Sequence, residues 1–338
     1  MLNRFESLPE GFLSVSAREL HTVLPGPSLI HLPGRRRQPL FVSLLLHGNE
    51  DVGLRAVQRL LREFRGQHLP RALSLFVGNV AAARQGLRRL DGQPDYNRVW
   101  PVQGQAGDTA EQRMMAEVVA EMARRSPFAA VDLHNNTGLN PHYACINRLG
   151  QDFYHLARLF SRTVVYFLKP EGVASMAMAE LCPAITCECG RTGDQSGVEH
   201  ALAFLQACLK LSNFPDQPIA SRDIDLFHTV ATVKVPPSVS FGFGESDHDI
   251  RFIEQLDHLN FSEVEAGTMI AQVRQDGPIP LQVLDEQGRR VERDYFQVSN
   301  GELRFARRIM PAMLTRDVRV IEQDCLCYLM ERYPLSDI

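Results

Sequence analysis

Hydrophobic residues between positions 40 and 211 follow two alternating patterns. Short apolar runs, typical of buried strands, occur at 40–46, 73–80, 128–134, 163–168 and 184–190. Between them lie stretches whose apolar residues repeat with the period of a helix, most clearly at 52–64, 109–126 and 197–213. Strands that alternate with helices predict an α/β fold with a mixed, largely parallel sheet sandwiched by helices.

The hydrophobic pattern changes after Pro215. The segments there are short, alternate polar and apolar residues, and are separated by Gly, Asn, Asp and Pro. They lie at 228–235, 238–244, 267–273, 279–285, 294–300 and 302–309. Because turn-forming residues gather at 213–223, we expect an α/β domain over residues 1–215 and a smaller β-rich domain over 216–338.

Composition and charge argue against several classes of partner. The chain has 338 residues, a formal net charge of -4 and no basic run longer than 35–37, so no nucleic-acid surface is expected. The N-terminal segment does not resemble a signal peptide, and no window approaches the roughly 18 apolar residues of a membrane span. Seven cysteines are unremarkable for a protein of a reducing compartment. We therefore expect a cytoplasmic protein with no membrane partner, and its oligomeric state stays open.

Polar residues with possible chemical roles accompany the apolar runs. His47 and Glu50 follow the first run, Asn79 lies at the end of the second, His134 ends the third, and Glu188 lies in the last. The carboxyl ends of strands in an open α/β sheet form the crevice in which such folds bind their ligands. Side chains that are far apart in the sequence are therefore expected to converge there.

Two imidazoles and one carboxylate are available from His47, Glu50 and His134. Three protein ligands, with a fourth position open to water, are typical of a catalytic zinc site. Gly48 is expected to permit the turn between His47 and Glu50, and Asp132 to accept a hydrogen bond from His134. His-x-x-Glu alone arises often by chance, and a strand-end histidine is usually structural, so the prediction depends on the second histidine.

Glu188 is unusual because it lies in an apolar strand, between two cysteines. A lone buried carboxylate is unfavourable unless it is paired or has a chemical role. Near a Lewis acid it would suit the general base that deprotonates a bound water. The structural alternative is an ion pair, for which Arg191 is a candidate.

Other polar residues give weaker signals. His142 could touch a substrate, although a solvated loop histidine is the more common case. The pairs Cys187-x-Cys189 and Cys325-x-Cys327 could form a second metal site, but buried cysteines are common core residues, and we favour that interpretation.

Several short motifs together resemble one family, the succinylglutamate desuccinylase/aspartoacylase branch of the zinc carboxypeptidase-like hydrolases. They are "HGNE" (47–50), "GN" (78–79), "RQGLRRLDGQPDYNR" (84–98), "DLH" (132–134) and "TCECG" (186–190). Their order and spacing cover most of residues 40–200. The combination is far more specific than any one motif.

The resemblance implies a role for each matching residue. It assigns the zinc ligands to His47, Glu50 and His134, and the catalytic acid/base to Glu188. It also implies that Arg88 polarises the scissile carbonyl.

Substrate binding is implied for the "D-x-N-R" motif and its surroundings. Asn97 and Arg98 match the pair that holds the substrate's α-carboxylate, and Asn79 is grouped with them as a candidate. The sequence departs from the family pattern at Val80, where proline is usual, and has about two extra residues between Arg88 and Asn97. Arg89 therefore competes with Arg88, and the loop 135–147 also differs.

We therefore expect a zinc-dependent amidohydrolase that contains one Zn²⁺ per chain and removes the acyl group from an N-acyl amino acid with a free α-carboxylate. The resemblance implies that the β-rich domain caps the cleft. The alternatives are a zinc carboxypeptidase that acts on short peptides, and a non-catalytic binding module on a degenerate hydrolase scaffold. The sequence names neither the acyl group nor the amino acid.

Overall fold

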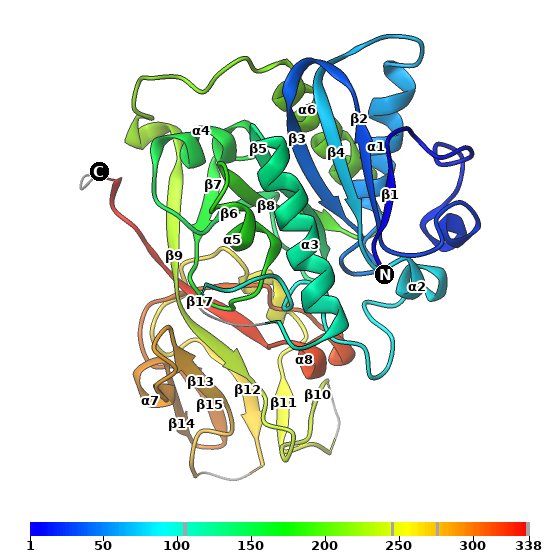
Figure 1. Ribbon diagram of the computed structural model, residues 1–338. Helices are drawn as coiled ribbons and strands as arrows, with labels where there is room; N and C mark the ends of the chain where they lie inside the picture. Colours follow the sequence, from blue (N-terminus) through cyan, green and yellow to red (C-terminus); the bar gives the residue numbers. More distant parts are fainter. Residues whose placement is uncertain (104–106, 245–246, 275–276, 336–338) are drawn as a thin grey trace.

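A twelve-stranded mixed sheet forms the centre of the computed structural model, which describes residues 1–103, 107–244, 247–274 and 277–335 (Figure 1). Eleven strands follow one path, and the twelfth, β13 (Gln282–Asp285), pairs with β9. In order across the sheet the path runs through β1 (Asn3–Phe5), β2 (Ser28–Leu32), β4 (Leu69–Val77), β3 (Gly34–Leu44), β5 (Ala129–Asn136), β8 (Ala184–Arg191), β6 (Tyr143–Ile146), β7 (Thr163–Tyr166), β9 (Asp225–Lys234), β17 (Cys327–Arg332) and β16 (Met310–Ala312).

The strands at the middle of this sheet run parallel, and they carry most of the predicted site. β3 pairs in parallel with β4 and β5, and β5 pairs in parallel with β8. β6 then pairs antiparallel with β8, so the sheet is mixed. Their apolar side chains are buried on both faces, as expected for a sheet covered by helices.

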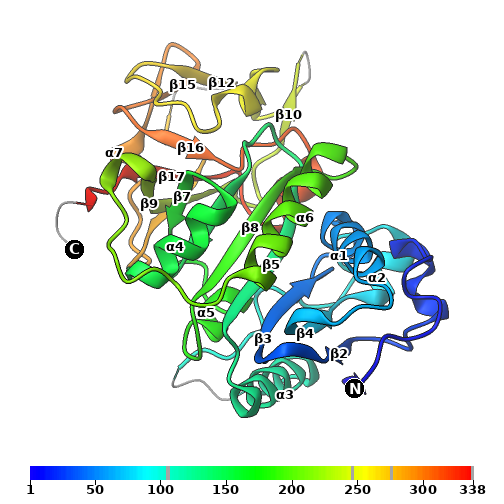
Figure 2. The same cartoon turned by 90° about the horizontal axis from the view of Figure 1, so that it is seen from above.

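Helices cover both faces of the sheet, as the two views in Figures 1 and 2 show. Three lie on one face, where α6 (Gln195–Lys210) contacts both α1 (Val52–Glu63) and α4 (Gln151–Phe160). The other face carries α3 (Ala110–Arg125) and α5 (Ala174–Met178). The shorter helices are α2 (Val80–Gln85), α7 (Glu292–Tyr295) and α8 (Val318–Gln323), with 3-10 turns η1 (Ala17–Thr22), η2 (Ser221–Asp223) and η3 (Leu256–Leu259).

Helix α3 illustrates how the local sequence sets the ends of an element. The Thr109 side chain accepts a hydrogen bond from the backbone N–H of Gln112, and the Gln112 side-chain oxygen accepts one from the backbone N–H of Thr109, which forms a capping box. Two arginines in the last turn interact favourably with the negative end of the helix dipole. Met115, Val118 and Met122 form its buried face, as the helical period predicted.

A second, five-stranded sheet lies at the lower end of the molecule in Figure 1. Its order is β10 (Phe241–Phe243), β11 (Ile250–Phe252), β12 (Met269–Val273), β15 (Glu302–Phe305) and β14 (Phe296–Ser299). The predicted fold class is thus confirmed: a mixed, largely parallel α/β sheet with helices, and a small C-terminal β sheet.

The large sheet nevertheless continues past residue 215. β9 pairs in parallel with β7, and three further C-terminal strands extend the sheet from β9. An alternating polar pattern identifies a strand but not the sheet it joins, so this continuation could not be read from periodicity. The division into residues 1–215 and 216–338 stays a prediction.

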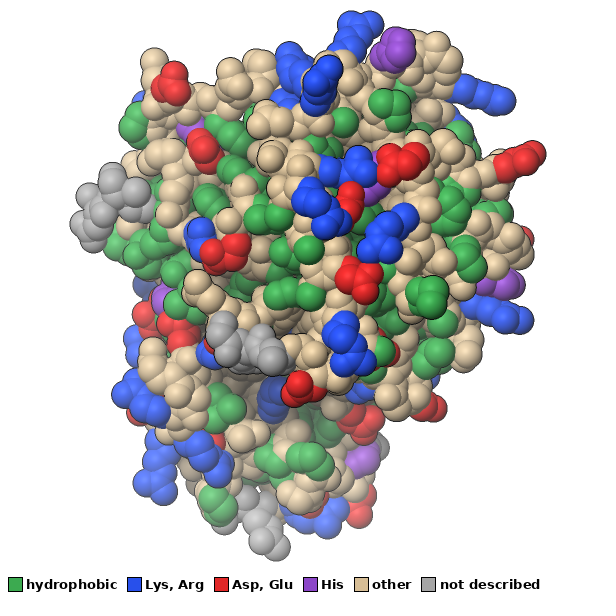
Figure 3. Space-filling view, in the orientation of Figure 1, with side chains coloured by type: hydrophobic (Ala, Val, Ile, Leu, Met, Phe, Trp, Pro, Cys, Tyr) green, Lys and Arg blue, Asp and Glu red, His purple; other side chains and the backbone are tan. Residues whose placement is uncertain are grey.

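Three further features of the described residues concern the expected environment of the protein. None of the described helices is long and apolar enough to cross a membrane. The surface shown in Figure 3 intersperses basic and acidic side chains over the face that carries α3. All seven cysteines are free and buried.

Candidate metal centre and active site

The chain reverses at the end of β3, and this reversal sets the position of His47. β3 ends at Leu44, and Leu45 adopts a left-handed backbone with φ 55°, which is rare for a residue with a branched side chain. The backbone N–H of Asn79 donates to the Leu45 carbonyl over 2.6 Å. Glu50 lies two residues before α1, so the side chains of His47 and Glu50 are both at the carboxyl end of the sheet.

Gly48 is required for close packing and not for the turn that we expected it to permit. Its φ lies outside the left-handed region, but a Cβ atom there would lie 2.2 Å from the backbone nitrogen of Ala83 in α2. The Gly48 N–H also donates to the backbone carbonyl of Arg88 over 3.0 Å. The backbone approach therefore joins the histidine loop to the segment that carries Arg88.

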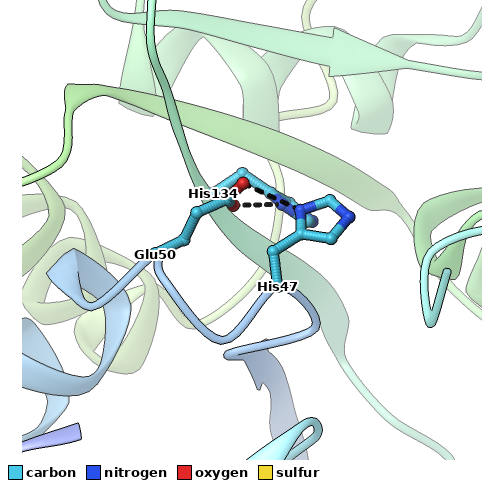
Figure 4. Close-up of side chains that lie close together, drawn as sticks. All are labelled: His47, Glu50 and His134. Carbon is cyan, nitrogen blue, oxygen red and sulfur yellow. Dashed lines mark hydrogen bonds and ion pairs between the residues drawn. The ribbon is translucent and has the colours of Figure 1, made fainter. Parts of the chain in front are cut away.

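His47, Glu50 and His134 lie together at this edge, and the Glu50 carboxylate faces both imidazole rings (Figure 4). Nδ1 of His47 is 2.8 Å from Oε1 of Glu50, and Nδ1 of His134 is 2.8 Å from Oε2. All three side chains are at most 6% exposed. His134 arrives there because β5 lies directly beside β3.

Each histidine also contacts a carboxylate of its own through Nε2, the ring nitrogen that points away from Glu50. Nε2 of His47 is 3.0 Å from Oδ1 of Asp95, and Nε2 of His134 is 2.7 Å from Oδ2 of Asp132. Ser43 on β3 donates to the other oxygen of Asp132 over 2.6 Å. Carboxylates in this position fix the ring orientation of metal-binding histidines and increase their basicity.

The electrostatics of the cluster follow from its burial and its charge pairs. Burial opposes charge on Glu50, but the two imidazoles outweigh it and hold the pKa of this carboxyl well below its usual range. Burial likewise opposes charge on His134, yet Asp132 and Glu50 raise the pKa of its imidazole well above the usual value. The cluster thus favours positive charge at its centre, where a cation would be stabilised.

The three residues fit a metal ion in their donor atoms and spacing. Their candidate ligand atoms all lie within 4.8 Å of one another, and within the described residues no other group of three His, Cys, Asp or Glu side chains meets this criterion. Two imidazole nitrogens and one carboxylate oxygen form a common ligand set of catalytic zinc. The two cysteine pairs considered above therefore do not gain a third ligand in the described chain.

Glu188 lies on β8, where the strand register pairs it with His134 of β5. Its side chain is buried, and burial raises its pKa to about 7. Asn136 approaches it, with Nδ2 3.5 Å from Oε2. Arg191 instead forms an ion pair with Asp257 at 3.0 Å, so the proposed Glu188–Arg191 pair is absent.

The two competing arginines have different surroundings. Arg88 lines the same cavity as the three candidate metal ligands, and its Nη1 is 3.6 Å from Oε1 of Glu50. Asp95 holds Nη2 of Arg88 at 3.0 Å. Arg89 instead donates to the backbone carbonyl of Gln93 over 2.7 Å and does not line the cavity. The geometry favours Arg88 for a role in the site.

Arg98 and Asn97 also line the cavity, but both already have protein partners. Nη2 of Arg98 is 3.0 Å from Oδ1 of Asp324, which precedes β17. The Asn97 carbonyl oxygen of the side chain accepts from the backbone N–H of Ala174, and its Nδ2 is 3.2 Å from Nε2 of His134. Asn97 thus lies beside His134 and holds the start of the α5 segment.

Two candidates lie outside the cavity. Asn79 caps α2, since its Oδ1 accepts from the backbone N–H of Ala82 and its Nδ2 donates to Gln93. This cap ends the predicted strand 73–80 early, at Val77. The His142 ring packs beside His200, with centroids 4.6 Å apart, and does not contribute to the cavity lining.

The cavity beside the cluster has a volume of about 100 Å³ and is open to solvent. Residues from both the N-terminal and C-terminal parts of the chain line it, the latter including Met313, Asp324 and Tyr328.

Sequence reasoning missed two acidic residues of the site. Asp95 lies within the quoted "D-x-N-R" motif, so its spacing from Asn97 and Arg98 was a signal that could have been used. Asp324 lies in "EQDC", which has no recognisable pattern, and its contact with Arg98 spans 226 residues. Only the folded chain brings Asp324 to the arginines.

Comparisons with known proteins show the family and the fold to which this chain is similar. A family model described as the succinylglutamate desuccinylase/aspartoacylase catalytic domain matches residues 39–212. No curated protein matches the chain in a sequence search.

Solved structures share the fold at low sequence identity. A succinylglutamate desuccinylase from Chromobacterium violaceum has 18% identity and a TM-score of 0.57, over 90% of this chain and 87% of that one. A succinylglutamate desuccinylase/aspartoacylase from Rhodobacter sphaeroides has 15% identity and a TM-score of 0.55, over 90% and 88%. Murine aminoacylase 3 has 15% identity and a TM-score of 0.52, over 88% and 96%.

Proposed function

The chain belongs to the succinylglutamate desuccinylase/aspartoacylase family, and on this premise we propose that it is a zinc-dependent amidohydrolase that removes the acyl group from an N-acyl amino acid with a free α-carboxylate. The observation that carries the proposal is the convergence of His47, Glu50 and His134 beside a cavity that also contains a buried glutamate, Glu188. A degenerate binding module would have no need to keep this combination of ligands and proton acceptor.

The metal would be held by Nδ1 of His47, Nδ1 of His134 and the carboxylate of Glu50. A zinc ion in such a site supplies Lewis acidity, which polarises a carbonyl and makes water a better nucleophile near neutral pH. Asp95 and Asp132 would keep the two rings oriented through their outer nitrogens.

Two side chains of the cavity suit the remaining steps of amide hydrolysis. The Glu188 carboxylate would accept a proton from the attacking water and then return it to the amine nitrogen that leaves. The Arg88 guanidinium, fixed by Asp95, would stabilise the negative charge that develops on the carbonyl oxygen.

Arg98 is our candidate for the substrate's α-carboxylate. Its Nη1 donates to the backbone carbonyl of Asn97 and its Nη2 contacts Asp324, yet a guanidinium has five N–H donors, and this side chain is 27% exposed. A substrate carboxylate would therefore share Arg98 with Asp324. Asn97 also lines the cavity, and its side-chain amide would donate to the same carboxylate.

The test compares Glu188→Gln with the wild type, both loaded with zinc. We expect the variant to lose about 10²- to 10⁴-fold in kcat for release of the free amino group, the usual contribution of general acid–base catalysis. Its zinc content should be unchanged, because Glu188 is not a proposed ligand. Full activity in the variant would contradict the proposed role.

The same assay distinguishes the proposed deacylase from the carboxypeptidase alternative. N-acyl amino acids and unmodified dipeptides are offered at equal concentrations to the zinc-loaded protein. The proposal requires faster turnover of the N-acyl amino acids, and a preference for dipeptides would favour the peptidase.

A further inference from the structure

The cavity has two walls of different chemistry, and this contrast bears on the identity of the substrate. One wall carries Arg88, Arg98, Asp324 and the three candidate metal ligands. The other wall, called the apolar wall below, is formed by side chains of β6, β7 and the C-terminal strands, which belong to a separate apolar cluster. Seven residues of that cluster line the cavity: Tyr143, Cys145, Val165, Phe167, Ala312, Met313 and Met330.

The apolar wall offers little to a charged group. Tyr143 is its main polar side chain, and the hydroxyl donates to the Met313 sulfur over 3.0 Å. Lys169 is the one described cavity-lining Lys or Arg besides Arg88 and Arg98. It is 44% exposed and forms an ion pair with Glu171 at 2.6 Å. A substrate carboxylate placed on this wall would lose its hydration without gaining a buried cation.

Charges of the protein itself largely neutralise the charged wall. Asp324 lies 3.3 Å from Nη2 of Arg88 and 3.0 Å from Nη2 of Arg98, so one carboxylate contacts both guanidinium groups. Asp95 contacts Arg88 as well. Two arginines thus face two aspartates, and a substrate with several carboxylates would bring further negative charge close to Asp324.

We propose that the cavity selects substrates with a single carboxylate and an apolar remainder, and that Asp324 is the specificity-determining residue that disfavours a second carboxylate. This inference rests on the proposed deacylase function. The α-carboxylate would lie at Arg98, and the apolar part of the substrate would pack against β6 and β7. N-acyl amino acids with an uncharged acyl group and an apolar side chain form this class.

The test is a panel of four substrates that differ in their number of carboxylates. N-acetyl-leucine carries one, N-acetyl-aspartate and N-succinyl-leucine carry two, and N-succinyl-glutamate carries three. Free amino groups released by the zinc-loaded protein give kcat/KM for each. We expect N-acetyl-leucine to exceed either dicarboxylate at least about tenfold, a discrimination within the range that a pocket achieves by differential binding.

Variants test whether the charge of Asp324 causes the preference for substrates with one carboxylate. Asp324→Asn keeps the size of the side chain and removes its charge, and we expect the monocarboxylate preference to fall about tenfold. The matched control is Asp317→Asn, on the same segment, where the side chain caps α8 and asparagine caps equally well. The control should keep the wild-type preference. Phe167→Arg adds a cation to the apolar wall and should shift the preference toward dicarboxylates.

The outcomes are distinguishable. A wild-type preference for N-acetyl-aspartate or N-succinyl-glutamate would overturn the inference and leave the deacylase function standing. Equal effects of Asp324→Asn on all four substrates would also overturn it, because Asp324 would then limit access without selecting. Release of no amine from any of the four, or from longer N-acyl-leucines, would remove the proposed function and this inference together. Equal zinc contents show that the variants keep the site.

Discussion

Asp132 provides the sharpest test of how the surrounding residues support the candidate metal site. Its side chain is buried, with Oδ2 2.7 Å from Nε2 of His134 and Oδ1 accepting from Ser43 over 2.6 Å. Asp132→Asn keeps the shape but removes the charge that faces the ring. The amide oxygen can still accept from Nε2–H of His134, and the amide nitrogen can donate to the Ser43 hydroxyl. The change therefore isolates the charge.

The expected magnitude follows from this geometry. The contact is short, buried and charge-assisted, the class of hydrogen bond that is roughly twice as strong as a neutral one. Changes of such supporting partners typically weaken metal affinity by about 10- to 100-fold. This range corresponds to about 1.4–2.8 kcal/mol in binding free energy. We expect the zinc Kd of Asp132→Asn to increase within that range.

Competition with a chromophoric chelator measures the zinc Kd of wild type and variant at one pH. Ser43→Ala is the graded control, because it removes only the neutral hydrogen bond to Asp132 and should change the Kd less than Asp132→Asn. Thermal unfolding of the metal-free proteins separates an effect on zinc from an effect on folding. A zinc Kd within twofold of the wild type would refute the role assigned to Asp132.

Three further predictions concern parts of the chain that support the site. Arg71 is buried, donates to three backbone carbonyls and lies 3.6 Å above the Phe128 ring, so Arg71→Met should lower the free energy of unfolding by about 2–4 kcal/mol in urea titrations. Gly48→Ala would place a Cβ 2.2 Å from the Ala83 nitrogen, and we expect at least about 1–3 kcal/mol of destabilisation together with weaker zinc binding. Hydrogen bonds from two arginines of α3 hold the pKa of Glu121 at about 2. The stabilisation by the ionised Glu121 carboxylate is present above the ordinary pKa of 4.5 and is lost as the pH falls through about 2. Glu121→Gln should therefore destabilise the protein by less than about 1 kcal/mol at pH 7 and by nothing well below pH 2.

The centre of the fold and the grouping of His47 with Glu50 and His134 were predictable because both depend on local patterns. A continuous apolar run indicates a buried parallel strand, and parallel strands place their carboxyl ends at one edge. His47 and His134 could therefore be paired across 87 residues before their strands were known to be neighbours. Glu188 was recognisable because a carboxylate is conspicuous in an apolar strand.

Features that depend on contacts across the chain could not be predicted in the same way. Gly48 follows a strand end, where a turn is the ordinary explanation, and its close approach to α2 appears only in three dimensions. Asp324 lies in a polar segment without periodicity, so nothing local connects it with Arg98. β9 has the alternating pattern of an independent β domain, yet its pairing with β7 joins it to the large sheet.

Stepwise addition of zinc to the metal-free protein tests the central proposal most directly. The readout is the rate at which N-acetyl-leucine, or the best N-acyl amino acid of the panel, releases its free amino group. If His47, Glu50 and His134 form one zinc site that supports hydrolysis, the rate should increase linearly and reach its plateau at one zinc per chain. A rate that does not depend on added zinc, or no hydrolysis of any N-acyl amino acid at any zinc concentration, would contradict the account.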